Sequence, residues 1–127
     1  MTRGLDAYKT TQVQSRTPLE LVVMLYDGAL RFIAVARDAV ERRDIPARRE
    51  ALSRTMAIVS ELQSTLNMEA GGEMAVRLDA LYDYVNDRLL NAAMTNTVAP
   101  LDEARKVLET LRDGWSTIAE AGQAGHK

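Results

Sequence analysis

The chain contains four stretches in which apolar residues recur every three or four positions, the spacing that places them on one face of an α-helix. No stretch sustains the strict alternation of apolar and polar residues that marks a strand with one buried face. The pattern therefore predicts an all-α fold.

The first predicted helix spans about 17 to 42. Thr17 is a suitable N-cap, Pro18 fits the first helical position, and Glu20 completes a capping box. The predicted core face of this helix consists of Val22, Leu25, Tyr26, Ala29, Ile33, Ala36 and Val40.

Three further helices follow at short intervals. The second is predicted to begin after Asp44, with Pro46 in its first turn, and to end near residue 70, before Gly71 and Gly72. The core faces of the last three helices are predicted to be Leu52, Met56, Val59, Leu62 and Leu66; Met74, Leu78, Leu81, Tyr82, Val85, Leu89 and Ala92; and Ala104, Leu108, Leu111, Trp115 and Ile118.

Short connections make sequential helices antiparallel neighbours, so residues 17–121 are predicted to form an up-down-up-down four-helix bundle. Residues 1–16 show no continuous apolar stripe and are predicted to be a mobile N-terminal arm. Residues 122–127 contain two glycines and are predicted to fray.

Composition and charge limit the kinds of partner and site that the chain can have. The formal charge of -2 and the pI near 5.4 give no broad positive field, so nucleic acid is not an expected partner. The chain has no cysteine, which excludes disulfides and thiolate metal sites. We find neither the apolar segment of a signal peptide nor a run long enough to cross a membrane, so no membrane insertion and a cytoplasmic location are expected.

The sequence offers no constellation for catalysis. The one histidine, His126, lies in the predicted tail, which leaves no base for a nucleophile and no ligand pair for a di-iron centre. Asp79, Asp83 and Asp87 recur every four residues and are interpreted as a solvated face, with a carboxylate metalloenzyme as an alternative. We expect no enzyme activity, no cofactor and no metal.

Two helices carry more apolar surface than a bundle core requires. On the first helix, Leu21 and Met24 flank the core face, and on the third Val76, Leu90 and Met94 lie away from it. Contiguous exposed apolar area usually marks a partner site. The alternatives are contact with the N-terminal arm, packing at helix edges, or burial in a homodimer.

Three segments, taken in order, resemble the FliS family of flagellar secretion chaperones. They are Thr-Pro-Leu-Glu-Leu-Val-Val-Met-Leu-Tyr-Asp-Gly-Ala-Leu at 17–30, Leu-Asn-Met-Glu-Ala-Gly-Gly-Glu-Met-Ala at 66–75 with Glu61-Leu62 before it, and Leu-Asp-Ala-Leu-Tyr-Asp-Tyr-Val at 78–85 with Arg88-Leu89-Leu90 after it. Ala7-Tyr8 and Trp115 also fall where the family has them. The family usually has Ala-Asn where this chain has Ala92-Ala93.

The resemblance implies a cytoplasmic export chaperone that binds the disordered C-terminal segment of flagellin, prevents its premature polymerisation and hands it to the export gate protein FlhA. It implies that Leu5 and Tyr8 cover part of the binding site or contact the export gate. The alternative is a homodimeric structural bundle with no foreign client, and a homodimer is also considered for the chaperone when it is free of client. The predicted flagellin-binding residues are Leu21, Met24, Ile58, Val76, Leu90 and Met94.

Overall fold

Local capping signals decide where the first two helices begin. The computed structural model describes residues 17–124, with side chains to residue 121, and its first helix is α2, Pro18–Arg42. The Thr17 hydroxyl accepts a hydrogen bond from the Glu20 amide at 3.2 Å. The Asp44 carboxylate accepts one from the Ala47 amide at 3.1 Å, at the start of α3, Ile45–Ser64. Both starts were predicted from the sequence and are confirmed.

The third helix begins earlier than predicted. Helix α3 ends at Ser64, not near residue 70, and α4 spans Met68–Thr95 with Asn67 as its N-cap. The Asn67 side chain accepts a hydrogen bond from the Ala70 amide at 2.9 Å, which fixes the first turn of α4 ahead of the two glycines. The predicted end of the second helix near residue 70 is therefore wrong, but the glycine pair does interrupt helical geometry, at Gly72. Gly72 has φ 51° and ψ −131° and bends α4 after its first turn.

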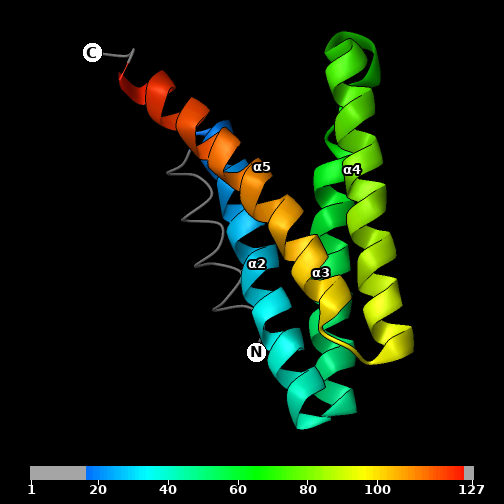
Figure 1. Ribbon diagram of the computed structural model, residues 1–127. Helices are drawn as coiled ribbons and strands as arrows, with labels where there is room; N and C mark the ends of the chain where they lie inside the picture. The colour runs from blue at the N-terminus through cyan, green and yellow to red at the C-terminus, as the bar shows by residue number, and fades with distance from the viewer. Residues whose placement is uncertain (1–16, 125–127) are drawn as a thin grey trace, which may run out of the picture.

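The four helices form an antiparallel bundle, as predicted. Helix α5, Ala99–Ala124, completes a ring in which α2 packs on α3 and α5, and α4 packs on α3 and α5 (Figure 1). The predicted arm at 1–16, with Leu5 and Tyr8, lies outside the described residues, as do residues 125–127. Among the described helices, none is long and apolar enough to cross a membrane.

Most of the predicted core faces are buried. The fully buried large side chains include Tyr26, Ile33, Val59, Leu62, Val85, Leu89, Leu101 and Leu108. Three predicted core residues are instead exposed: Met74 at 65%, Ile118 at 51% and Leu81 at 37%. All three come from α4 and α5, which diverge toward the start of α4 and the end of α5 (Figure 1).

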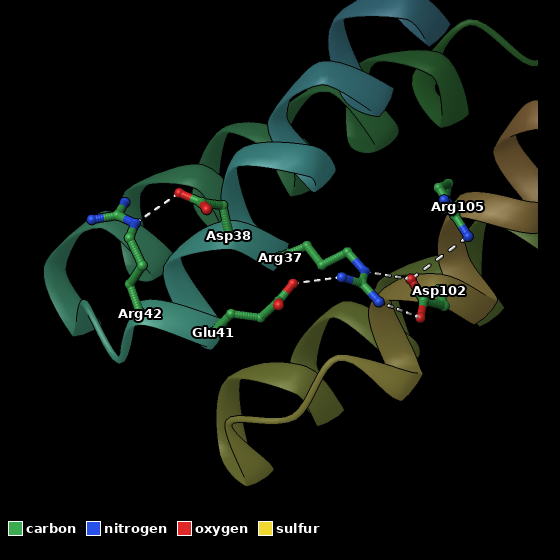
Figure 2. Close-up of polar contacts among 6 residues, drawn as sticks. All are labelled: Arg37, Asp38, Glu41, Arg42, Asp102 and Arg105. Carbon is green, nitrogen blue, oxygen red and sulfur yellow. Dashed lines mark hydrogen bonds and ion pairs between the residues drawn. The ribbon is translucent and has the colours of Figure 1, made fainter.

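Polar contacts hold α5 against α2 more extensively than against α4. The Arg37 guanidinium on α2 donates to both carboxylate oxygens of Asp102 in the first turn of α5, at 3.0 and 3.3 Å (Figure 2). Further along, Arg112 of α5 donates to Asp27 of α2 at 2.8 Å. Between α4 and α5, the polar contacts among the described residues all involve Glu103, also in the first turns of α5. Helix α5 therefore follows α2, and its later turns part from α4.

We call the end that holds the α2–α3 and α4–α5 connections the closed end, and the other the open end (Figure 1). At the closed end the buried Arg48 donates to the Asn96 side chain at 2.9 Å, across the α3–α4 pair. At the open end α2 begins, α3 passes into α4, and α5 terminates.

Candidate functional site

The divergence of α4 and α5 leaves an apolar trough at the open end. Its deepest part is a hollow of about 380 Å³ that is entered between the start of α2, the α3–α4 connection and the second half of α5. The hollow is lined by Pro18, Leu19, Val22, Leu62, Thr65, Leu66, Asn67, Gly71, Met74, Ala75, Leu78, Tyr82 and Trp115. Nearly all of these side chains are apolar, so the hollow is a part of the core that residues 17–121 leave uncovered.

A groove of about 320 Å³ lies next to this hollow, between α4 and α5. It is lined by Leu81, Tyr84, Glu103, Lys106, Val107, Thr110 and Leu111. Leu78 and Leu81 are one turn apart on α4, and Leu111 and Trp115 are one turn apart on α5, so the groove continues the hollow. We call the two together the α4–α5 trough.

Ile118 lines neither the hollow nor the groove, but it lies further along α5 on the same side as the groove. It follows Leu111 by seven residues, which places both on the same side of the helix. Exposed side chains of this size are unfavourable in water, since each Å² of apolar surface left uncovered forgoes about 25 cal/mol of transfer free energy. The trough has the shape and chemistry of a docking site for apolar side chains.

A hydrogen-bonded tyrosine pair lies beneath the hollow. The hydroxyls of Tyr26 on α2 and Tyr82 on α4 are 2.5 Å apart, and both residues are buried. Burial raises the pKa of both tyrosines, so the pair is neutral at physiological pH. The Trp115 indole, which can only donate, lies near the Tyr26 hydroxyl and acts to lower its pKa. Tyr82 and Trp115 both form part of the wall of the hollow.

The six predicted flagellin-binding residues do not form one surface. Val76, Leu90 and Met94 are exposed and share a strip of α4 that includes Asp83. Asp83 accepts a hydrogen bond from Gln63 of α3, which places this strip on the α3 side of α4, away from the trough. Met94, 78% exposed, is the most exposed large apolar side chain of the described chain.

The other three predicted residues are half-buried between helices. Ile58 of α3 lies against Gly28 of α2, with its Cδ1 3.3 Å from the position that a Cβ on Gly28 would occupy. Leu21 lies seven residues before Gly28 and faces the same α2–α3 seam. Met24 lines a separate groove between α2 and α5.

Sequence reasoning missed the trough because it assigned Met74, Leu81 and Ile118 to the core. Their helical spacing is that of buried residues, and the signal that distinguishes them is the divergence of two helices, which periodicity does not contain. The unusual run of aromatic and aliphatic residues at 78–85 is the nearest available signal in the sequence.

The aspartates considered as metal ligands have other partners. The Gln63 amide donates to Asp79 and to Asp83, at 2.8 Å each, and Asp87 pairs with Arg88 at 2.7 Å. Within residues 17–121, no group of three or more histidines, cysteines and acidic residues is arranged to hold a metal ion.

Comparison with known proteins places the chain in a family. The family model described as flagellar protein FliS matches residues 1–122. The flagellar secretion chaperone FliS of Salmonella typhimurium is 36% identical over 121 residues, which cover 91% of this chain and 90% of that protein. FliS of Bacillus subtilis is 37% identical, over 91% of this chain and 85% of that protein. FliSB of Pseudomonas aeruginosa is 36% identical, over 85% of this chain and 86% of that protein. This chain, with its antiparallel four-helix bundle and apolar trough, belongs to the FliS family of flagellar proteins.

Proposed function

We propose that the chain is a cytoplasmic export chaperone that binds the disordered C-terminal segment of flagellin, prevents its premature polymerisation and delivers it to the type III export gate through FlhA. The observation that carries this proposal is the α4–α5 trough, in a chain whose relatives are flagellar secretion chaperones. A segment whose apolar side chains are held in the trough is unable to use them to assemble with other flagellin molecules.

The energetics favour a segment that folds as it binds. Ordering a disordered segment costs about 2–5 kcal/mol of the gross interaction energy. Each large apolar side chain that becomes fully buried returns about 1.5–3 kcal/mol. Two or three anchors in the trough are therefore enough to offset the ordering cost, and contacts elsewhere on the bundle add to the affinity.

The trough is the proposed anchor site, and the predicted residues lie along the proposed path of the rest of the segment. Val76, Leu90 and Met94 offer exposed apolar contacts on the opposite side of α4 from the trough. Leu21, Met24 and Ile58 are half-buried, and a segment that wraps around α2 and α3 would reach them. Leu5 and Tyr8 remain proposed as a self-cap or as contacts to the export gate.

Calorimetric titration with a flagellin C-terminal peptide tests this function. Leu81→Asp and Met74→Asp each place a charge in the trough at an exposed position, so the bundle should persist while the affinity falls at least tenfold. Val35→Asp is the matched control, because Val35 is also exposed but lies on α2, outside the trough. Wild-type affinity in both trough variants would exclude the trough as the site.

The same titration tests the strip on α4. Leu90→Asp and Met94→Asp should lower the affinity for the peptide by a smaller factor than the trough variants do, because these side chains lie on a convex helix face and not in a hollow. Unchanged affinity in both would remove the strip from the path of the client.

A homodimer that buries the trough is the competing function. Sedimentation analysis with and without the peptide separates the two. The chaperone hypothesis predicts a complex of one chain and one peptide, whereas a structural dimer predicts a dimer mass that the peptide leaves unchanged.

A further inference from the structure

A second hollow lies on the α2–α3 side of the bundle. It has a volume of about 210 Å³ and is lined by Phe32 and Val35 of α2 and by Ala47, Glu50, Ala51 and Arg54 of α3. In the ring of four helices, the α2–α3 pair is opposite the α4–α5 pair, and this α2–α3 pocket shares no residue with the trough. Val35 is 49% exposed, so an apolar side chain at the mouth of the pocket faces solvent.

The pocket combines an apolar floor with arginine side chains. The Arg54 guanidinium stands 5.6 Å from the centroid of the Phe32 ring and pairs with Glu50 at 3.1 Å. Arg31 lies one turn before Val35 on α2, with its Nη2 3.9 Å from the position that a Cβ on Gly28 would occupy. Arg31 is exposed and has no ion-pair partner among residues 17–121.

The charge of this region differs from that of the rest of the bundle. Residues 31–54 contain seven arginines and four acidic residues, a net charge of +3. The other described side chains, at 17–30 and 55–121, comprise five basic and thirteen acidic residues, a net charge of −8. The part of the α2–α3 hairpin next to the closed end is therefore positive, whereas the hairpin as a whole (18–64) is neutral and the rest of the bundle is negative. This part attracts acidic partners by long-range electrostatics.

The shape of the seam suits a helix. Leu21, Leu25, Gly28, Phe32 and Val35 follow one another at intervals of four, three, four and three residues, the spacing of a straight seam between packed helices. Gly28 has no side chain, which lets Ile58 approach and keeps the seam shallow at its middle. A third helix that lies along the Phe32–Val35 end of this seam would place residues at matching intervals against these two side chains, beyond Leu21 and Ile58 on the proposed path of the client.

We propose that the α2–α3 pocket is a second docking site, which binds an amphipathic helix of a partner protein other than the export client. An apolar side chain of that helix enters the pocket between Phe32 and Val35, and carboxylates beside it pair with Arg31 and Arg54. Because the pocket and the trough lie on opposite sides of the bundle, both sites are occupied at once. The chaperone thus carries its client on one side and contacts an acidic helix on the other.

Two synthetic helical peptides with the same leucine positions test the proposal. One has glutamates flanking the leucines, and the other has lysines at those positions. The full chain should bind the glutamate peptide at least tenfold more tightly than the lysine peptide, and added salt should reduce the difference. Val35→Asp and Arg31→Glu should each lower the affinity for the glutamate peptide at least tenfold. If either charged variant unfolds, Val35→Ser and Arg31→Gln are the milder replacements. Leu81→Asp is the control that leaves this binding unchanged.

Saturating the chain with the flagellin C-terminal peptide should leave the affinity for the glutamate peptide within twofold. Displacement would assign the pocket to the client and overturn the proposal. A homodimer that Val35→Asp dissociates would assign the pocket to a second copy of the chain and also overturn it. Equal affinities for the glutamate and lysine peptides, or full affinity in Val35→Asp, would show that the pocket does not select an acidic helix. Flagellin affinity is measured separately, so either hypothesis can fail while the other stands.

Discussion

The closed and open ends of the bundle are built from the same kind of apolar helix face but differ in how completely that face is covered. At the closed end, Leu101 is fully buried, and Arg37, Arg48 and their partners bind the helices to one another. At the open end, Ile118 follows the same helical spacing and is half exposed. The closed end is therefore the more completely covered of the two, and the open end keeps the apolar trough that we propose as the client site.

Shortening one apolar side chain at each end should show the largest difference. Leu101→Ala removes a fully buried side chain at the closed end and should lower the free energy of unfolding by about 2–5 kcal/mol. Ile118→Ala should lower it by less than about 1 kcal/mol, because half of that side chain is already in water. Urea denaturation measures both values, and similar losses would mean that the two ends are equally packed.

Removing one hydroxyl of the tyrosine pair should lower the free energy of unfolding by an amount between those two values. Tyr82→Phe leaves the buried Tyr26 hydroxyl without this partner, which should cost about 1–3 kcal/mol. Tyr26→Phe combined with Tyr82→Phe should cost less than the two single variants added together, because no hydroxyl of the pair is then left unpaired. Additive losses in a double-mutant cycle would show that the hydroxyls do not depend on each other.

Glycine substitutions distinguish the bent start of α4 from the regular part of α5. Gly72→Ala should destabilise the protein by about 1–2 kcal/mol, since its positive φ is unfavourable for a residue with a Cβ. Gly114→Ala should instead stabilise it by up to about 1 kcal/mol, because the glycine is helical and a Cβ there meets nothing within 4 Å. A neutral Gly72→Ala would indicate that α4 straightens without cost.

The smallest expected effect is electrostatic and belongs to the closed end. The hydrogen bond from Arg37 lowers the pKa of Asp102 below its ordinary value of 3.8 (Figure 2). Because this pKa is lower in the folded chain than in the unfolded chain, the pair adds stability above the ordinary pKa and loses it as the pH falls through the folded value.

Asp102→Asn should therefore reduce the free energy of unfolding by up to about 1 kcal/mol at neutral pH, since the pair is partly exposed, and the difference from wild type should shrink as the pH falls through the folded pKa of Asp102. Glu61→Gln is the control, because Glu61 is exposed and has no ion pair within residues 17–121. A difference that persists in acid would show that Asp102 acts through packing and not through its charge.

Much of the fold could be predicted from the sequence because its signals are local. Thr17 and Asp44 cap helices through residues three positions away, and the stripe from Tyr26 to Val40 needs only a helical period to be recognised. Asn67 is an equally good cap, but the glycines at 71 and 72 suggested a later boundary. The glycine pair does interrupt helical geometry, at Gly72, but within α4 and not between α3 and α4.

The trough could not be predicted, since periodicity gives the direction in which a side chain points and not whether a neighbouring helix covers it. Leu108 and Ile118 belong to the same stripe of α5, yet one is buried and the other exposed. What separates them is the pairing of α5 with α2 through Arg37–Asp102 and Asp27–Arg112, contacts between residues far apart in the chain. The burial of Arg48 at the closed end is likewise a consequence of tertiary packing.

Fluorescence of Trp115 tests the central claim most directly, because it is the one tryptophan of the chain and its ring lines the hollow of the trough. Titration with a flagellin C-terminal peptide that lacks tryptophan should shift its emission to shorter wavelength and protect it from acrylamide, with the same midpoint as calorimetric binding. Tight calorimetric binding with unchanged emission and quenching would place the client elsewhere and contradict the account.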